Sequence, residues 1–152
     1  MGYGETRVDV DITEQSLDGG DPFAGLGGAG DGAALVFVGR VRNLNEDRQV
    51  VGIEYEAYRE MALKVLRGIC ARASAEHEVG HVRAVHRTGC LKVGEASVAV
   101  SVSAPHRAAC YAASKQIMDD LKQLLPVWKK EQYADGSADW LGAPTSAQDA
   151  GA

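Results

Sequence analysis

The chain has 152 residues, which is enough for one domain with a real core and too few for two comfortable ones. Its net charge of −5, from 16 basic and 21 acidic residues, argues against nucleic acid as the main partner, because phosphate binding needs a positive field. No window holds the ~20 apolar residues of a membrane span, and the first residues do not resemble a signal peptide, so we expect a cytoplasmic protein.

The N-terminal part of the chain predicts a strand followed by a glycine-rich loop. Residues 7–13 alternate apolar and polar side chains, as a half-buried strand does. Seven glycines then fall within residues 19–32. Because no lysine and no GK[ST] sequence follows them, we interpret this segment as a flexible surface loop and not as a phosphate-binding loop.

Two strands and a helix are predicted next. The apolar run 33–43 predicts a buried strand with Arg40 and Arg42 at its exit, and residues two apart on an extended chain point the same way. Residues 50–58 predict another strand. Residues 59–77 repeat apolar side chains every three or four positions, which predicts an amphipathic helix.

The second half predicts two strands and a second helix. Residues 82–89 are a strand candidate, and residues 96–104 alternate valine with serine or alanine, as a strand with one apolar face does. Residues 105–125 predict a helix that begins at a proline, with Ser103 or Ala104 as its cap. Its predicted buried stripe is Cys110, Ala113, Ile117, Leu121 and Leu124. Residues 131–152 predict turns, anchored by Trp140.

This order of elements predicts an α+β domain with a largely antiparallel sheet and two main helices. We expect a single domain over residues 1–141 and a disordered tail over residues 142–152. The three cysteines are spaced twenty apart without a CxxC pair, and the four histidines show no HExxH pattern. We therefore predict buried apolar cysteines, no metal site and no cofactor.

The stretch LKQLLPVWKKE, residues 121–131, places a lysine on each side of a proline. Pro126 cannot donate to the carbonyl of Lys122, so it bends the chain there. Such a break lets Lys129 fold back toward Lys122, with Met118 one turn earlier on the same face as a pocket wall. On spacing alone, two ordinary exposed lysines explain the pattern better.

A second basic pair, His106 and Arg107, falls in the first turn of the predicted second helix. Cations are unfavourable at this positive end of the helix dipole, and a bound anion would relieve the cost. Taken alone, the pair is better explained as two solvated residues.

Four motifs in order, FVGRVRN, IEYEAYREMA, SAPHR and IMDDLKQLLPVWKKE, resemble the large, catalytic subunits of molybdopterin synthase, the MoaE family. The resemblance runs from about Ala33 to Trp140. It implies an α/β hammerhead fold and a sulfurtransferase of molybdenum cofactor biosynthesis. Such an enzyme converts cyclic pyranopterin monophosphate into molybdopterin by installing the two sulfurs of a dithiolene.

The resemblance also implies roles for particular residues. The essential lysines of the family fall on Lys122 and Lys129. The substrate-binding positions are these two lysines together with Arg40, Val41, Arg42, His106, Arg107, Lys130 and Glu131. We hypothesise that Lys122 handles the carrier's C-terminus and the transferred sulfur, with Lys129 assisting in proton transfer or positioning.

The implied partners are a small ubiquitin-like sulfur carrier, ending in a Gly-Gly thiocarboxylate, and a second copy of the chain within a heterotetramer. The main rival interpretation is a non-catalytic module that binds a phosphorylated small molecule, or a scaffold that kept the fold. A second rival, an RNA-binding α+β domain, is disfavoured by the negative charge and by the lack of clustered aromatic side chains.

Overall fold

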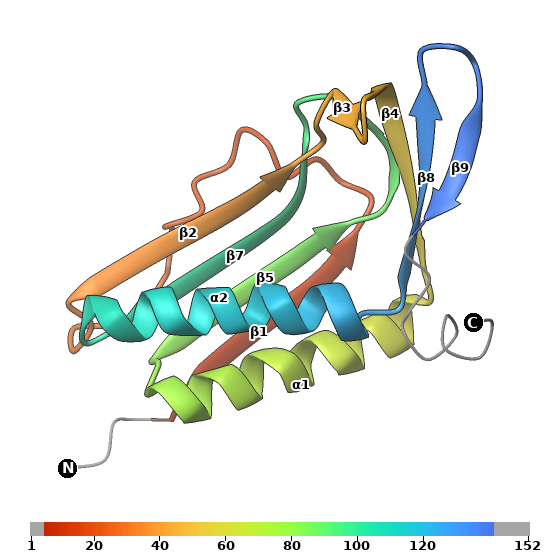
Figure 1. Ribbon diagram of the computed structural model, residues 1–152. Coiled ribbons are helices and arrows are strands. Elements are labelled where there is room, and N and C mark those ends of the chain that lie inside the picture. The colour runs from red at the N-terminus through yellow and green to blue at the C-terminus, as the bar shows by residue number, and fades with distance from the viewer. Residues whose placement is uncertain (1–4, 142–152) are drawn as a thin grey trace.

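The computed structural model describes residues 5–141, so the tail predicted over residues 142–152 lies outside the described residues. Two helices and two sheets confirm the predicted α+β class (Figure 1). Between residues 5 and 141, no helix has the length and apolar character needed to cross a membrane. The elements are β1 Arg7–Thr13, β2 Ala33–Arg40, β3 Leu44–Asn45, β4 Arg48–Ala57, α1 Arg59–His77, β5 His81–Arg87, β6 Gly89–Lys92, β7 Ala96–Ala104, α2 Arg107–Leu124, β8 Val127–Tyr133 and β9 Ala138–Leu141.

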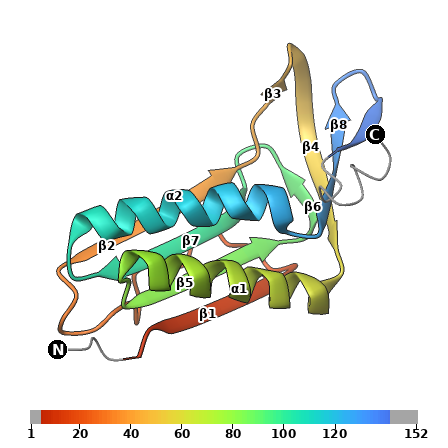
Figure 2. The ribbon, with the colours of Figure 1, turned by 60° about the horizontal axis from the view of Figure 1, so that its bottom comes forward.

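The first sheet has four strands in the order β1-β5-β7-β2. Strands β1 and β5 are parallel, while β5, β7 and β2 pair antiparallel. Both helices cover one face of this sheet (Figure 2). The alternation in β7 accounts for the packing, because Val98, Val100 and Val102 are buried in the same core cluster as the helices.

The apolar stripes predicted for both helices are buried except at Val65, which is half-buried, and at Leu124. Helix α1 buries Leu66 and Ile69, and helix α2 buries Ile117 and Leu121, in one continuous core. Leu124, predicted to belong to the α2 stripe, is instead 48% exposed, because the helix ends there and the chain turns away.

Replacing Leu66 by alanine tests this core. Leu66 is fully buried, so we expect Leu66→Ala to lower the free energy of unfolding by ~2–5 kcal/mol through lost burial and the cavity left behind. Denaturation in urea measures the loss. Met61→Ala on the same helix is the control, because Met61 is 57% exposed. An equal loss in both variants would contradict this description of the core.

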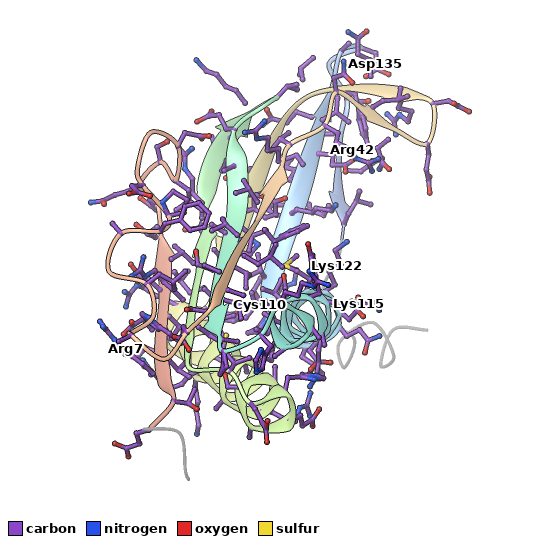
Figure 3. All side chains as sticks on the ribbon, turned by 90° about the vertical axis from the view of Figure 1, so that its left-hand side faces the viewer. Arg7, Arg42, Cys110, Lys115, Lys122 and Asp135 are labelled. Atoms are coloured by element: carbon purple, nitrogen blue, oxygen red, sulfur yellow. The ribbon has the colours of Figure 1, made fainter. Side chains whose placement is uncertain are left out.

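The glycine-rich segment is a loop, as predicted, but it packs against the sheet. It lies on the face of the first sheet opposite the helices (Figure 3). The amide of Gly27 donates to Nδ1 of His81, and Arg83 donates to the carbonyl of Ala24. Gly27 has a φ of +77°, and a Cβ there would lie 2.2 Å from Oγ of Ser103, so the close approach needs glycine.

The second sheet has the order β3-β4-β8-β9, and β6 also pairs with β4. Figure 1 shows it standing at the end of the helix layer where α2 stops. The prediction of turns from residue 131 onward is wrong for the end of β8 and for β9. Strand β8 carries four consecutive polar residues, so its sequence has little apolar periodicity to indicate a strand. It forms a strand because it pairs with β4. Trp140, predicted as an anchor, is 51% exposed on edge strand β9.

Element boundaries differ from the predictions by a few residues. Helix α2 begins at Arg107, and its N-cap is His106 in extended conformation, so the predicted cap at Ser103 or Ala104 is wrong. The strand predicted over residues 33–43 ends at Arg40 after a register shift between Gly39 and Arg40.

Candidate functional site

The two lysines around Pro126 meet at one pocket of about 470 Å³. It lies where the end of α2 approaches both sheets, and Figure 3 shows Lys122 on α2 with Arg42 above it. The pocket has four basic residues and a mainly apolar and neutral remainder. The lining residues are Phe37, Gly39, Arg40, Arg42, Tyr55, His86, Ser97, Val98, Met118, Leu121, Lys122, Leu125, Val127 and Lys129.

Pro126 brings the lysines together by ending the helix, and the predicted kinked helix is wrong in this detail. Leu125 has φ −70° and ψ 125°, the extended conformation that a following proline favours. Its amide makes the last helical bond, to the carbonyl of Leu121. The chain then enters β8, so Lys122 reaches the pocket from a helix end and Lys129 from a strand.

Lys129 is held by a buried carboxylate. It pairs with Tyr55 across the β4–β8 ladder, and its Nζ lies 3.6 Å from Oε1 of Glu131. The Glu131 side chain is only 4% exposed and does not line the pocket. Glu131, expected to bind substrate, is therefore placed to hold Lys129.

Lys130, which was expected to bind substrate, does not line the pocket and points away from it. Successive side chains on a strand face opposite sides, so Lys130 and Lys129 cannot share a face. The Nζ of Lys130 lies 5.5 Å from the centre of the Trp140 ring.

Two of the three residues in the strand-end segment 40–42 line the pocket. Arg40 and Arg42 both line the pocket, as their spacing predicted. Strand β2 ends at Arg40, where its register with β7 shifts, so Arg42 follows the strand end. Val41, which was also expected to bind substrate, lies between them. It is 3% exposed in the second core cluster, and its side chain does not line the pocket.

His106 and Arg107 lie at the other end of α2. Fifteen residues separate Arg107 from Lys122, which is ~22 Å along a helix. Both residues are exposed, and neither lines the pocket. Within one chain, the structure does not bring this basic pair to the lysines.

Comparison with known proteins decides the family. The model of the MoaE protein family matches residues 12–124. The chain belongs to the MoaE family. It is 37% identical over 131 residues to molybdopterin synthase catalytic subunit 1 of Mycobacterium tuberculosis, covering 86% of this chain and 88% of that protein.

Solved structures agree with this MoaE assignment. Molybdopterin synthase from Staphylococcus aureus matches with a TM-score of 0.80 and 30% identity, over 87% of this chain and 96% of that one. A chain in the complex of subunits 1 and 2 of molybdopterin-converting factor from Helicobacter pylori has the same fold, with a TM-score of 0.65, 18% identity and 88% coverage of both chains. These matches confirm the resemblance, the hammerhead-type fold and the assignment to molybdopterin synthase, a sulfur-transferring enzyme of molybdenum cofactor biosynthesis.

Two residues in the floor of the MoaE pocket were not expected from the sequence. The rings of Tyr55 and His86 meet edge to face, with centroids 5.1 Å apart. Burial raises the pKa of Tyr55 and lowers the pKa of His86, so both stay neutral near pH 7. Tyr55 lies opposite Lys129 because of the register between β4 and β8, and nothing in the local sequence pattern marks His86 as a pocket residue.

The cysteines do not take part in this pocket. Cys70 and Cys110 are buried, as predicted, and burial raises the pKa of the Cys70 thiol to about 12. Cys90 is exposed on β6, so its predicted burial is wrong. None of the three lines the pocket, and among residues 5–141 no three His, Cys, Asp or Glu side chains form a metal-binding group.

Proposed function

We propose that this chain transfers sulfur from the C-terminal thiocarboxylate of a small ubiquitin-like carrier to cyclic pyranopterin monophosphate, forming the dithiolene of molybdopterin. The observation that carries the proposal is the convergence of Lys122 and Lys129, from a helix end and a strand, on one pocket with Arg40 and Arg42. Simple anion binding does not require this lysine pair.

The charges of the pocket suit both reactants. The substrate carries a cyclic phosphate, and the sulfur donor is an anion. Arg40, Arg42, Lys122 and Lys129 offer charge-assisted hydrogen bonds to such groups. The neutral floor of Tyr55 and His86, with Met118 as a wall, offers a less polar surface for the pterin ring system.

The two lysines differ in exposure and in their contacts, so they suit different roles. Lys122 is exposed at the helix end, where its amine can meet an incoming chain terminus and serve as a base or a nucleophile toward the spent acyl group. Lys129 is half-buried and tethered to Glu131, which suits proton transfer or positioning of substrate.

The site is completed by a second copy of the chain in a homodimer. Strand β2 is an edge strand, and Phe37 and Val38 on it are 40% and 39% exposed. A groove of about 460 Å³ between β2 and α2 includes the 63% exposed Tyr111 and also Met118. An unpaired edge beside apolar surface is suited to pairing with a second copy.

Such pairing explains the remote basic pair. Two β2 strands related by a two-fold axis run antiparallel, so the start of one lies beside the end of the other. The amide of Gly32, just before β2, donates to the carbonyl of Pro105, so β2 and α2 start together. The partner subunit's His106 and Arg107 would then approach the pocket at Lys122 and bind phosphate or pterin.

The carrier subunit completes a cytoplasmic heterotetramer, with one carrier at each end of the central dimer. The two-subunit complex of molybdopterin-converting factor from Helicobacter pylori supports such an assembly for this fold. The exposed end of α2 gives the carrier's C-terminal Gly-Gly a route to Lys122.

Reconstitution tests the function directly. The purified chain is mixed with thiocarboxylated carrier and cyclic pyranopterin monophosphate, and dithiolene product is assayed. We expect product that depends on all three components. Absence of product, with carrier and substrate verified using a known synthase, would favour the non-catalytic binding module instead.

A further inference from the structure

We propose that Tyr133 and Asn45 are positioning residues that act on Lys129 through the buried carboxylate of Glu131. The inference rests on the sulfur-transfer function proposed above. It assigns a role in the site to two residues that lie outside the pocket itself.

The two oxygens of Glu131 have different partners. Oε2 accepts hydrogen bonds from Nδ2 of Asn45 at 2.8 Å and from the hydroxyl of Tyr133 at 3.0 Å, while Oε1 lies 3.6 Å from Nζ of Lys129. A carboxylate with 4% exposure is costly unless hydrogen bonds satisfy it. The two neutral donors satisfy Oε2 and fix the plane of the carboxylate, which leaves Oε1 directed at the lysine.

Tyr133 is itself held from two sides. Its ring is 6% exposed and packs in the second core cluster with Val50 and Leu91. The guanidinium of Arg48 lies 3.5 Å from the ring centre and donates to Oδ2 of Asp139. Burial, and then the bond to Glu131, raises the pKa of Tyr133, so the hydroxyl keeps the proton that it donates.

Asn45 reaches the carboxylate from a different element. It lies half-buried on β3, a two-residue strand paired with β4, and its amide spans 86 positions of sequence to Glu131. The β3–β4 hairpin and the β8–β9 hairpin therefore meet at Glu131. A lysine side chain has many rotamers, and a fixed carboxylate restricts the ammonium to the pocket.

A double-mutant cycle with Glu131→Gln separates this role from a general effect on folding. Tyr133→Phe keeps the buried ring, and Asn45→Ala removes a half-buried amide, so both variants should fold. In the full chain with its carrier, we expect each to lower kcat ~3- to 10-fold with little change in KM. In the Glu131→Gln background, the further loss should be less than ~2-fold, because the residues act through Glu131. Tyr58→Phe, which alters a 66% exposed tyrosine, is the control.

A second measurement does not depend on catalysis. Side-chain NMR relaxation of lysines labelled with ¹³C at Cε reports how restricted Lys129 is. We expect its order parameter to fall in Tyr133→Phe toward that of exposed Lys64, with Lys64 itself unchanged.

The outcomes separate this inference from the function on which it rests. A wild-type chain that forms no product would count against sulfur transfer, while the relaxation measurement would still test the tether. An unchanged Lys129 order parameter would overturn the positioning role. An active wild type in which Tyr133→Phe loses the same factor with and without Glu131→Gln would overturn it as well.

Discussion

Replacing Lys122 by alanine is expected to reduce sulfur transfer at least ~100-fold while the fold is retained. The side chain is exposed at the last turn of α2, and alanine is at least as good a helix former, so little stability depends on it. The lost amine, however, is the group placed to meet the carrier's C-terminus. Dithiolene formation in the reconstituted system measures the effect.

A second substitution at this position separates charge from chemistry. Lys122→Arg retains the positive charge but cannot become a neutral amine. We expect it to be nearly as inactive as Lys122→Ala, while Lys64→Ala on α1 keeps full activity. Near-full transfer by Lys122→Ala would remove Lys122 from the mechanism, and recovery by arginine would reduce its role to electrostatics.

Mixed dimers are expected to show whether the pocket is shared between subunits. Lys122→Ala and Arg107→Ala should each be strongly impaired as homodimers. If the partner subunit's Arg107 completes each pocket, a hybrid of the two variants has one fully intact site and one site with both changes. Random mixing makes about half of the dimers hybrids, so about a quarter of wild-type activity should return.

The same experiment has a clear opposite outcome. A site contained in one chain would leave every pocket in the mixture with one defect, and no activity would return. Refolding the two variants together ensures exchange of subunits. Lys122→Ala mixed with itself through the same procedure is the control, and differential tags allow the hybrid fraction to be counted.

Most of the helices and strands could be predicted from the sequence because its strongest patterns are local. The valine alternation in β7 and the stripes of α1 and α2 depend on residues two to four positions apart, and the structure buries these side chains. Strand β8 has no such pattern. It is a strand because β4 lies beside it and supplies the hydrogen bonds. Pairing between residues 70 or more positions apart leaves no mark on local periodicity.

The candidate site, like the fold, could be predicted from the sequence only in part. The sequence alone shows a lysine on either side of a proline and two arginines at the end of a predicted strand. It also contains the motifs that resemble the MoaE family. Only the tertiary structure decided that Lys129 faces the pocket and Lys130 faces away, and that Glu131 is buried with Asn45 and Tyr133 as donors. The reason is physical: residue types specify charge and local bend, whereas burial and side-chain direction depend on which distant segments pack together.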